Sequence, residues 1–158
     1  MKRFAYLFLG VAALASSCKK DDSTQATTPA VSPKVGLLVG KRWGLTALTA
    51  QRGSLSQDGY ATLKPCEKDN YIRFNDDRTA EVNEGPSKCS PADAASYAGT
   101  WELVGNDSKL LLTTPLFGTG AAGTPDILEL TTSRLVLRGV LIDGNGVTTT
   151  YTATLTTL

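Results

Sequence analysis

The sequence contains no histidine among its 158 residues. This absence excludes Ser-His-Asp and Cys-His catalysis, because both need an imidazole as the general base. It also excludes zinc sites built on histidine, and three cysteines are too few for a thiolate cluster. Any general acid–base chemistry would therefore depend on carboxylates, lysines or tyrosines.

The sequence also lacks an excess of charge of either sign. Lysine and arginine together number 16, and aspartate and glutamate number 15. No basic stripe of the kind that binds nucleic acid interrupts this balance, so no nucleic-acid partner is expected. The length predicts one folded domain, since ~100–200 residues per domain is usual.

The apolar run at the N-terminus, Phe4 to Ala15, is too short to span a bilayer, which takes ~20 residues. It follows the basic residues Lys2 and Arg3, and this order is typical of a signal peptide. The small residues 15–17 then lead into Cys18, which is the composition of a bacterial lipoprotein cleavage site. We therefore predict a signal peptide over residues 1–17 and a lipid on Cys18 that makes the membrane a partner. An ordinary secretory signal, cut near Ser17, is the alternative.

Residues 18–34 are rich in serine, threonine, alanine and proline, a composition that cannot bury a core. We interpret them as the lipidated N-terminus and a flexible tether. The folded domain is then expected over residues 35–158. The short apolar run Val35–Val39 at its start is compatible with a helical turn that closes one end of a barrel.

Three cysteines leave one unpaired in an exported chain. If Cys18 carries lipid, Cys66 and Cys89 remain as a pair that an oxidising compartment would let close. The entropy of closing that loop predicts a stabilisation of roughly 3–4 kcal/mol. Two separate buried thiols are the alternative.

Most of the remaining chain alternates apolar and polar residues with a period of two, which is the pattern of half-buried strands. We expect three strands in the stretch 66–103, with the disulfide joining the first to the loop before the third. Residues 51–63 form either a loop or the second half of a long hairpin, and Asp143–Gly146 is a hairpin turn. The predicted inward residues are Ile72, Phe74, Ala80, Val82, Trp101, Leu103, Leu110, Leu112, Leu128, Leu130, Leu135, Leu137, Tyr151, Ala153 and Leu155.

These patterns predict an all-β fold of eight short antiparallel strands, joined in sequence by short turns. Such a set forms an up-and-down barrel or a sandwich, and the sequential connections favour the barrel. An eight-stranded barrel has no free sheet edges and can hold one small ligand.

A resemblance to a known family supports the barrel. The chain has Gly-Lys-Arg-Trp at 40–43, Cys-Glu-Lys-Asp-Asn-Tyr-Ile-Arg-Phe at 66–74, Cys89, Gly-Thr-Trp-Glu-Leu at 99–103 and Leu-Val-Leu at 135–137. In this order they resemble the lipocalin-like domains of small surface lipoproteins from Bacteroidetes-type bacteria. The resemblance covers about residues 35–158 and implies an eight-stranded lipocalin-like barrel with a possible cavity, but no catalytic residues. Lys-Lys-Asp-Asp at 19–22 also looks like the signal that sends such lipoproteins to the cell surface, which implies an outer-membrane location.

Trp43, Phe74, Trp101 and Tyr151 are the candidates for a ligand cavity, since pockets are mostly apolar with a few polar groups. The same four side chains could equally fill a solid core. No cofactor is expected.

Glu67 and Asp69 could perform acid–base chemistry or hold calcium, but such residues more often form caps and turn hydrogen bonds. The turns 75–77 and 143–145 offer further oxygen ligands without a complete EF-hand loop, so no metal site is predicted.

Three functions remain open at this point. The chain is a non-enzymatic module that binds a small apolar ligand, a glycan or a protein. Alternatively, it is a structural lipoprotein of the cell envelope with a packed barrel. A hydrolase that uses two carboxylates is the third and weakest hypothesis.

Overall fold

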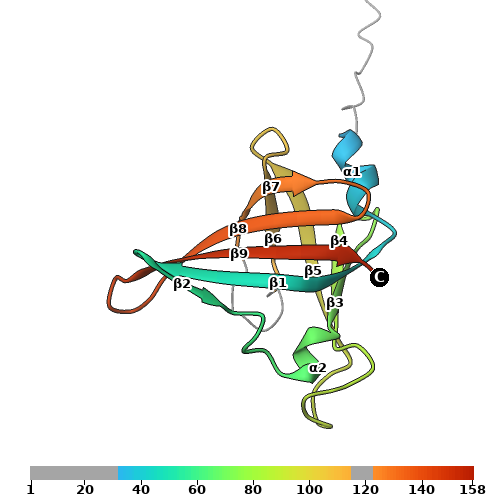
Figure 1. Ribbon diagram of the computed structural model, residues 1–158. Helices are drawn as coiled ribbons and strands as arrows, with labels where there is room; N and C mark the ends of the chain where they lie inside the picture. The colour runs from blue at the N-terminus through green and yellow to red at the C-terminus, as the bar shows by residue number, and fades with distance from the viewer. Residues whose placement is uncertain (1–31, 115–122) are drawn as a thin grey trace, which may run out of the picture. The chain divides into compact units, whose positions relative to one another are not determined.

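The computed structural model describes residues 32–114 and 123–158. In this part of the chain nearly all regular structure is β-strand, and no helix is long and apolar enough to cross a membrane. The elements are α1 (Pro33–Leu38), β1 (Arg42–Arg52), β2 (Leu55–Asp58), α2 (Pro65–Lys68), β3 (Tyr71–Phe74), β4 (Thr79–Asn83), β5 (Ser96–Val104), β6 (Lys109–Leu112), β7 (Asp126–Leu130), β8 (Arg134–Ile142) and β9 (Thr148–Thr157) (Figure 1).

Eight of these strands close into an antiparallel barrel. Each of β3 to β8 pairs with the next strand in sequence, and β1 pairs with both β3 and β9. The predicted eight-stranded up-and-down barrel is therefore confirmed. The additional strand β2 pairs only with the far half of β1, so the polar stretch after β1 does form the second half of a long hairpin.

The barrel has two different ends. The turns at 75–78, 105–108 and 131–133 lie at the end where α1 packs, which we call the helix end. Lys34 Nζ of this helix donates to Asp107 O at 2.8 Å, and Lys41 Nζ, just after it, donates to Thr132 O at 3.0 Å. The opposite end, which we call the mouth, carries the long connections 59–70 and 84–95 and the hairpin 143–147.

The helix α1 closes the helix end as the sequence predicts. Pro33 occupies its first turn, where a missing N–H costs nothing, and Ser32 Oγ caps it by accepting from Lys34 N at 3.2 Å. Val35 and Leu38 are buried and belong to the same core cluster as the strand residues. This helix begins two residues before the expected start of the folded domain.

The core follows the period-two pattern of the strands. Almost every side chain predicted to face inward is buried or packed against the buried cluster. The fully buried large side chains are Leu38, Trp43, Ile72, Phe74, Trp101, Leu110, Leu135 and Leu155. Burial of apolar surface of this extent is the main stabilising contribution, at ~25 cal/mol per Å².

Two local predictions are wrong. Leu128 does not face inward, and 49% of it is exposed. The pairing of β7 with β8 shifts between Ile127 and Glu129, and this bulge turns Leu128 outward while Ile127 and Leu130 pack on the core. Cys66 lies in the single helical turn α2 and not on a strand, because the strand begins only at Tyr71.

Candidate functional site

Three of the four aromatic candidates form a packed layer near the helix end. Trp43 and Phe74 are fully buried and Trp101 is almost so. Trp43 Nε1 donates to Leu38 O at 2.9 Å, and Trp101 Nε1 donates to Asn75 O at 3.0 Å, so neither indole N–H is left unpaired. The rings of Phe74 and Trp101 meet edge to face with centroids 5.6 Å apart. These three residues act as core at this end of the barrel.

Tyr151, the fourth candidate, lies apart from that layer. It faces inward on β9 and lies four residues closer to the mouth than Leu155, which is fully buried on the same face. Its direct neighbours across the sheet are Ala50 on β1 and Gly139 on β8. Tyr151 is only partly buried, so its ring forms part of the wall in the mouth half of the barrel.

The inward-facing side chains change in size from one end of the barrel to the other. Near the helix end they are large and buried, as at Trp43, Leu135 and Leu155. In the mouth half the inward positions include small, only partly buried residues, which are Ala50, Gly139 and Ala153. Tyr97, inward on β5 beside the mouth, is 44% exposed. The inward side chains are therefore large and buried at the helix end and are smaller or more exposed toward the mouth.

Gly99 and Gly139 are both inward-facing glycines, but they differ in the space that surrounds them. A Cβ on Gly99 would lie 2.7 Å from Thr114 Cβ, so this position needs glycine for the close approach of the two segments. A Cβ on Gly139 would have no atom nearer than 4.0 Å, and the nearest is Pro125 Cβ. Gly139 therefore leaves room that a larger side chain could occupy.

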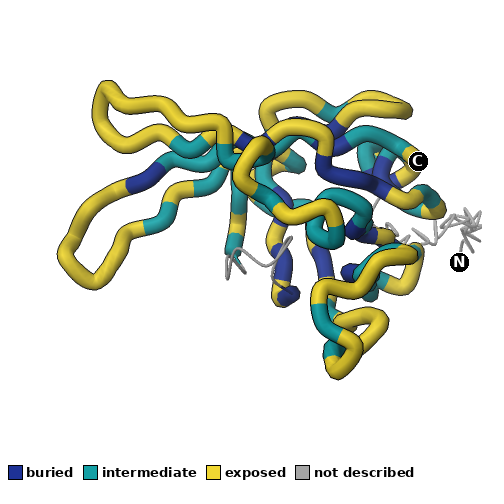
Figure 2. Tube along the Cα trace, turned by 60° about the horizontal axis from the view of Figure 1, so that its bottom comes forward, coloured by how far each residue is buried: buried dark blue, intermediate teal, exposed yellow. Residues whose placement is uncertain are grey.

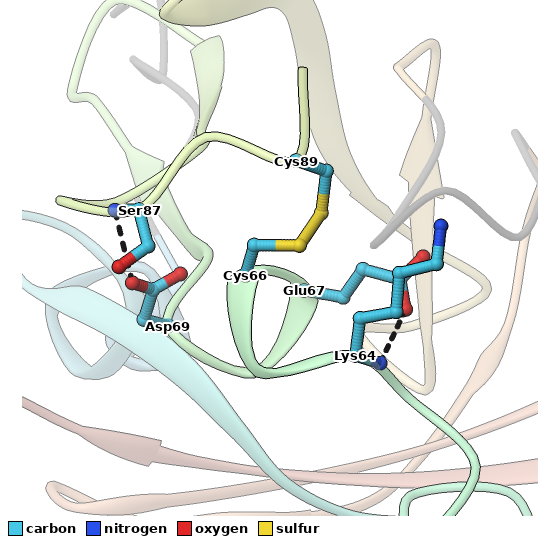
Figure 3. The surroundings of a disulfide bond; sticks show 6 residues. All are labelled: Lys64, Cys66, Glu67, Asp69, Ser87 and Cys89. Carbon is cyan, nitrogen blue, oxygen red and sulfur yellow. Dashed lines mark hydrogen bonds between the residues drawn. A yellow bond between two sulfur atoms is a disulfide. The ribbon is translucent and has the colours of Figure 1, made fainter. Parts of the chain in front are cut away.

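The disulfide between Cys66 and Cys89 joins the two long connections at the mouth, with Cα atoms 5.2 Å apart (Figure 3). Asp69 Oδ2 accepts from Ser87 N at 3.1 Å across the same two loops. A Cβ on Gly85, at φ +69°, would lie only 2.4 Å from Asp69 O, so the loops also touch through their backbones. The predicted pairing is confirmed, and it fixes one side of the mouth.

The carboxylates considered for chemistry instead stabilise local turns. Glu67 Oε2 accepts from Lys64 N at 2.7 Å and caps α2 (Figure 3). Asp143 Oδ1 accepts from the backbone N–H of Val147 and of Asn145, each at 2.9 Å. These two hydrogen bonds, with Arg52 nearby, lower the pKa of Asp143 below its usual value. Residues 32–114 and 123–158 contain no cluster of three acidic or cysteine side chains that could hold a metal.

Arg52 is a charged residue that contacts the inward row at the mouth. Its Nε donates to Thr149 Oγ1 at 3.3 Å, and its Nη2 lies 3.6 Å from Asp143 Oδ2. Both members of this ion pair are largely exposed, so it contributes little to stability. It does connect the β1–β2 hairpin to the β8–β9 hairpin.

Sequence reasoning named four aromatic residues as cavity candidates and placed Ala153 on an inward row, but it did not single out Ala50 and Gly139. Ala50, Gly139 and Ala153 carry no chemical group that attracts notice, and their common level in the barrel depends on register across three strands. The signal available in the sequence was the change from leucine to a small residue within each row, from Leu48 to Ala50, from Leu137 to Gly139 and from Leu155 to Ala153. The lipidation candidate Cys18 lies outside the described residues.

The fold defines a class, that of small closed antiparallel barrels whose strands follow one another in sequence. The chain belongs to the lipocalin-like domain family, whose model matches residues 38–137. No functionally curated protein matches the sequence.

Similar solved structures include bovine odorant binding protein complexed with its natural ligand. That match has 15% identity and a TM-score of 0.45, and it covers 81% of this chain and 76% of that one. A deswapped triple mutant of the same bovine protein matches with 16% identity and a TM-score of 0.42, covering 76% and 73%.

Proposed function

We propose that this chain is a membrane-anchored, non-enzymatic binding protein of the cell envelope that takes a small apolar ligand into the mouth half of its barrel. The observation that carries the proposal is the difference in filling along the barrel. Large side chains pack the helix end, while Ala50, Gly139 and Ala153 leave the mouth half lined by small residues beside Tyr151. Membership of the lipocalin-like family supports the same reading.

The chemistry available favours binding over catalysis. The interior walls are mainly apolar, which suits an apolar ligand, and hydroxyls of Tyr151 and Thr149 could orient a polar group on it. The chain has no histidine to act as a general base near neutral pH. Glu67, Asp69 and Asp143 are engaged in hydrogen bonds to backbone amides. Binding of a glycan or a protein across the mouth would also be a non-enzymatic binding function, with a different class of ligand.

The anchoring part of the proposal rests on the N-terminal sequence. A basic start, a short apolar run and small residues before Cys18 support a lipid anchor, and Lys19–Asp22 supports an outer-membrane, surface-exposed location.

Gly139→Phe tests the ligand chamber, because a Cβ at this position meets open space and the ring would then project among the small residues. We expect binding of an apolar fluorescent probe, N-phenyl-1-naphthylamine, to weaken at least tenfold, which corresponds to about 1.4 kcal/mol. Thr152→Phe is the matched control, because Thr152 lies one strand away with its side chain on the outer face. The control should bind the probe as the parent does.

The competing function is a packed barrel without a ligand that serves as a structural component of the envelope. It predicts that the parent chain does not bind the probe and that native mass spectrometry finds the bare chain mass. It also predicts that Gly139→Phe destabilises the fold, because no space would be free for the ring. Either probe binding unaffected by Gly139→Phe or no binding by the parent would reject our proposal.

A further inference from the structure

Two arginines lie directly opposite each other on the outer surface of the barrel. The antiparallel register of β1 and β3 pairs Arg42 with Arg73 (Figure 1). Their neighbours Trp43 and Ile72 are fully buried in the core, so the alternation of a strand places both arginine side chains on the outer face. Both arginines are exposed.

This pair differs from other exposed arginines of the protein. Arg134 and Arg138 each donate to a carboxylate of β7, at 3.0 Å and 3.1 Å. The ion pairs between described residues involve neither Arg42 nor Arg73. Two adjacent guanidinium groups are therefore left without an anion from the part of the chain that the structure describes.

An acidic residue on the same face does not neutralise them. Glu81 on β4 lies opposite Arg73, but its Oε1 accepts from Asn83 Nδ2 at 3.5 Å and forms no ion pair with Arg73. One carboxylate beside two guanidinium groups leaves an excess of positive charge. Like charges directly opposite each other in a sheet reduce its stability, so the stability of the fold does not explain this arrangement.

Tyr71 holds one of the two arginines in place. Cζ of Arg42 lies 5.4 Å from the centroid of the Tyr71 ring. Tyr71 is the next outward residue on β3 after Arg73, and it lies diagonally across from Arg42. A cation–π contact orients the guanidinium without neutralising it. Less side-chain freedom is then lost when Arg42 binds an anion.

We propose that Arg42 and Arg73 together bind the phosphate group of a phosphomonoester on the outer face of the barrel. Side chains directly opposite each other in an antiparallel pair have Cβ atoms about 4.5–5.5 Å apart, so both guanidinium groups can reach one phosphate. The planar fork of arginine matches phosphate oxygens in a bidentate manner. A phosphomonoester carries a charge of about −1.5 to −2 near neutral pH, which balances two arginines. A lipid headgroup and a soluble phosphorylated molecule offer this same chemistry.

The first test titrates the full chain, in nonionic detergent at low salt, with inorganic phosphate and follows the arginine Nε–Hε signals by NMR. The signals of Arg42 and Arg73 should shift together with one dissociation constant, while that of Arg134, which is paired with Glu129, should not move. Low salt is used because exposed charges are screened by ions. The absence of a shift at Arg42 and Arg73 would overturn the proposal.

Arg42→Gln and Arg73→Gln should each weaken phosphate binding about tenfold, because each removes charge-assisted hydrogen bonds. Figure 2 shows the long connections at the mouth as mostly exposed or half-buried. Lys64→Gln in one of them is the matched control, because it removes the same charge from an exposed residue at the other end of the barrel. Equal weakening in all three variants would mean that only the net charge matters, which contradicts a site at these arginines.

A stability measurement separates binding from a structural role of the arginines. Phosphate at low salt should raise the urea midpoint of the parent, because a ligand that binds the folded state stabilises it. It should not raise the midpoint of Arg73→Gln, whose own urea transition shows that the variant is folded. An equal rise in both proteins would reject the site.

The last measurement distinguishes the two sources of the phosphate. The same NMR signals are followed in detergent micelles that contain phosphatidic acid, with phosphatidylcholine micelles as the control. Binding to phosphatidic acid at lower concentrations than to inorganic phosphate would support a lipid headgroup as the ligand. Binding to inorganic phosphate at concentrations as low or lower would support a soluble phosphorylated molecule. An equal response to phosphatidylcholine, which has no phosphomonoester, would overturn the proposal.

Discussion

Trp101 combines three kinds of contact at a single position. Its ring meets Phe74 edge to face, its indole N–H donates to Asn75 O, and the Arg78 guanidinium lies 4.6 Å from its ring centroid. The neighbouring residue Glu102 faces the other way and is exposed. The alternation of a strand therefore places two adjacent residues in very different environments.

Replacing Trp101 with alanine should lower the free energy of unfolding by about 3–5 kcal/mol, because truncation of a buried tryptophan leaves a cavity. The hydrogen bond to Asn75 O is lost as well. Glu102→Ala should change the stability by less than ~0.5 kcal/mol, as expected for an exposed substitution. Urea unfolding of both variants measures the difference, and equal midpoints would show that Trp101 does not stabilise the core.

At the scale of elements, the mouth is built from loops that are joined to each other. The disulfide, the hydrogen bond from Ser87 N to Asp69 and the backbone contact at Gly85 all link the connection 59–70 to the connection 84–95. Neither connection contains a strand of the barrel, so these links decide how firmly this side of the mouth is held.

Replacing both Cys66 and Cys89 with serine should lower the stability by roughly 3–4 kcal/mol, as estimated for a loop with a sequence separation of 23. Amide hydrogen exchange should rise in the two connections much more than in β8 and β9, which pair over nine positions. Free-thiol labelling of the unreduced parent provides the control and should not modify either cysteine. Unchanged exchange in both connections after the substitution would mean that the disulfide does not hold the mouth.

At the scale of the whole molecule, the two ends of the barrel differ in what they contain. The helix end contains most of the large buried side chains and the helix α1. The mouth contains the long connections and the projecting hairpins. The meander topology allows the two ends to differ, because alternate turns fall at opposite ends.

Cys18→Ala tests the attachment. We expect this variant to leave the membrane fraction or to remain unprocessed, because the cysteine thiol is the proposed acylation site. Two or three acyl chains give stable attachment, whereas one chain is marginal. Detergent phase separation of cell envelopes measures the partition, with Ser17→Ala as the matched control that keeps a small residue and the thiol. An unchanged partition of the Cys18→Ala protein would reject lipidation as the anchor.

The sequence by itself determined the eight strands of the barrel, their meander, most of the inward positions and the disulfide. These features depend on local rules: side chains alternate along a strand, turn residues punctuate the chain, and an odd cysteine count leaves one natural pair. The same rules placed Trp43, Phe74 and Trp101 inside, where the structure has them.

The tertiary structure alone decided what depends on register between strands. The bulge that turns Leu128 outward and the common level of Ala50, Gly139 and Ala153 both arise from which residues lie opposite each other. A shift of one residue in such pairing moves every side chain to the other face, and it depends on two strands that are distant in the sequence. The candidate ligand chamber is therefore a property of the closed barrel.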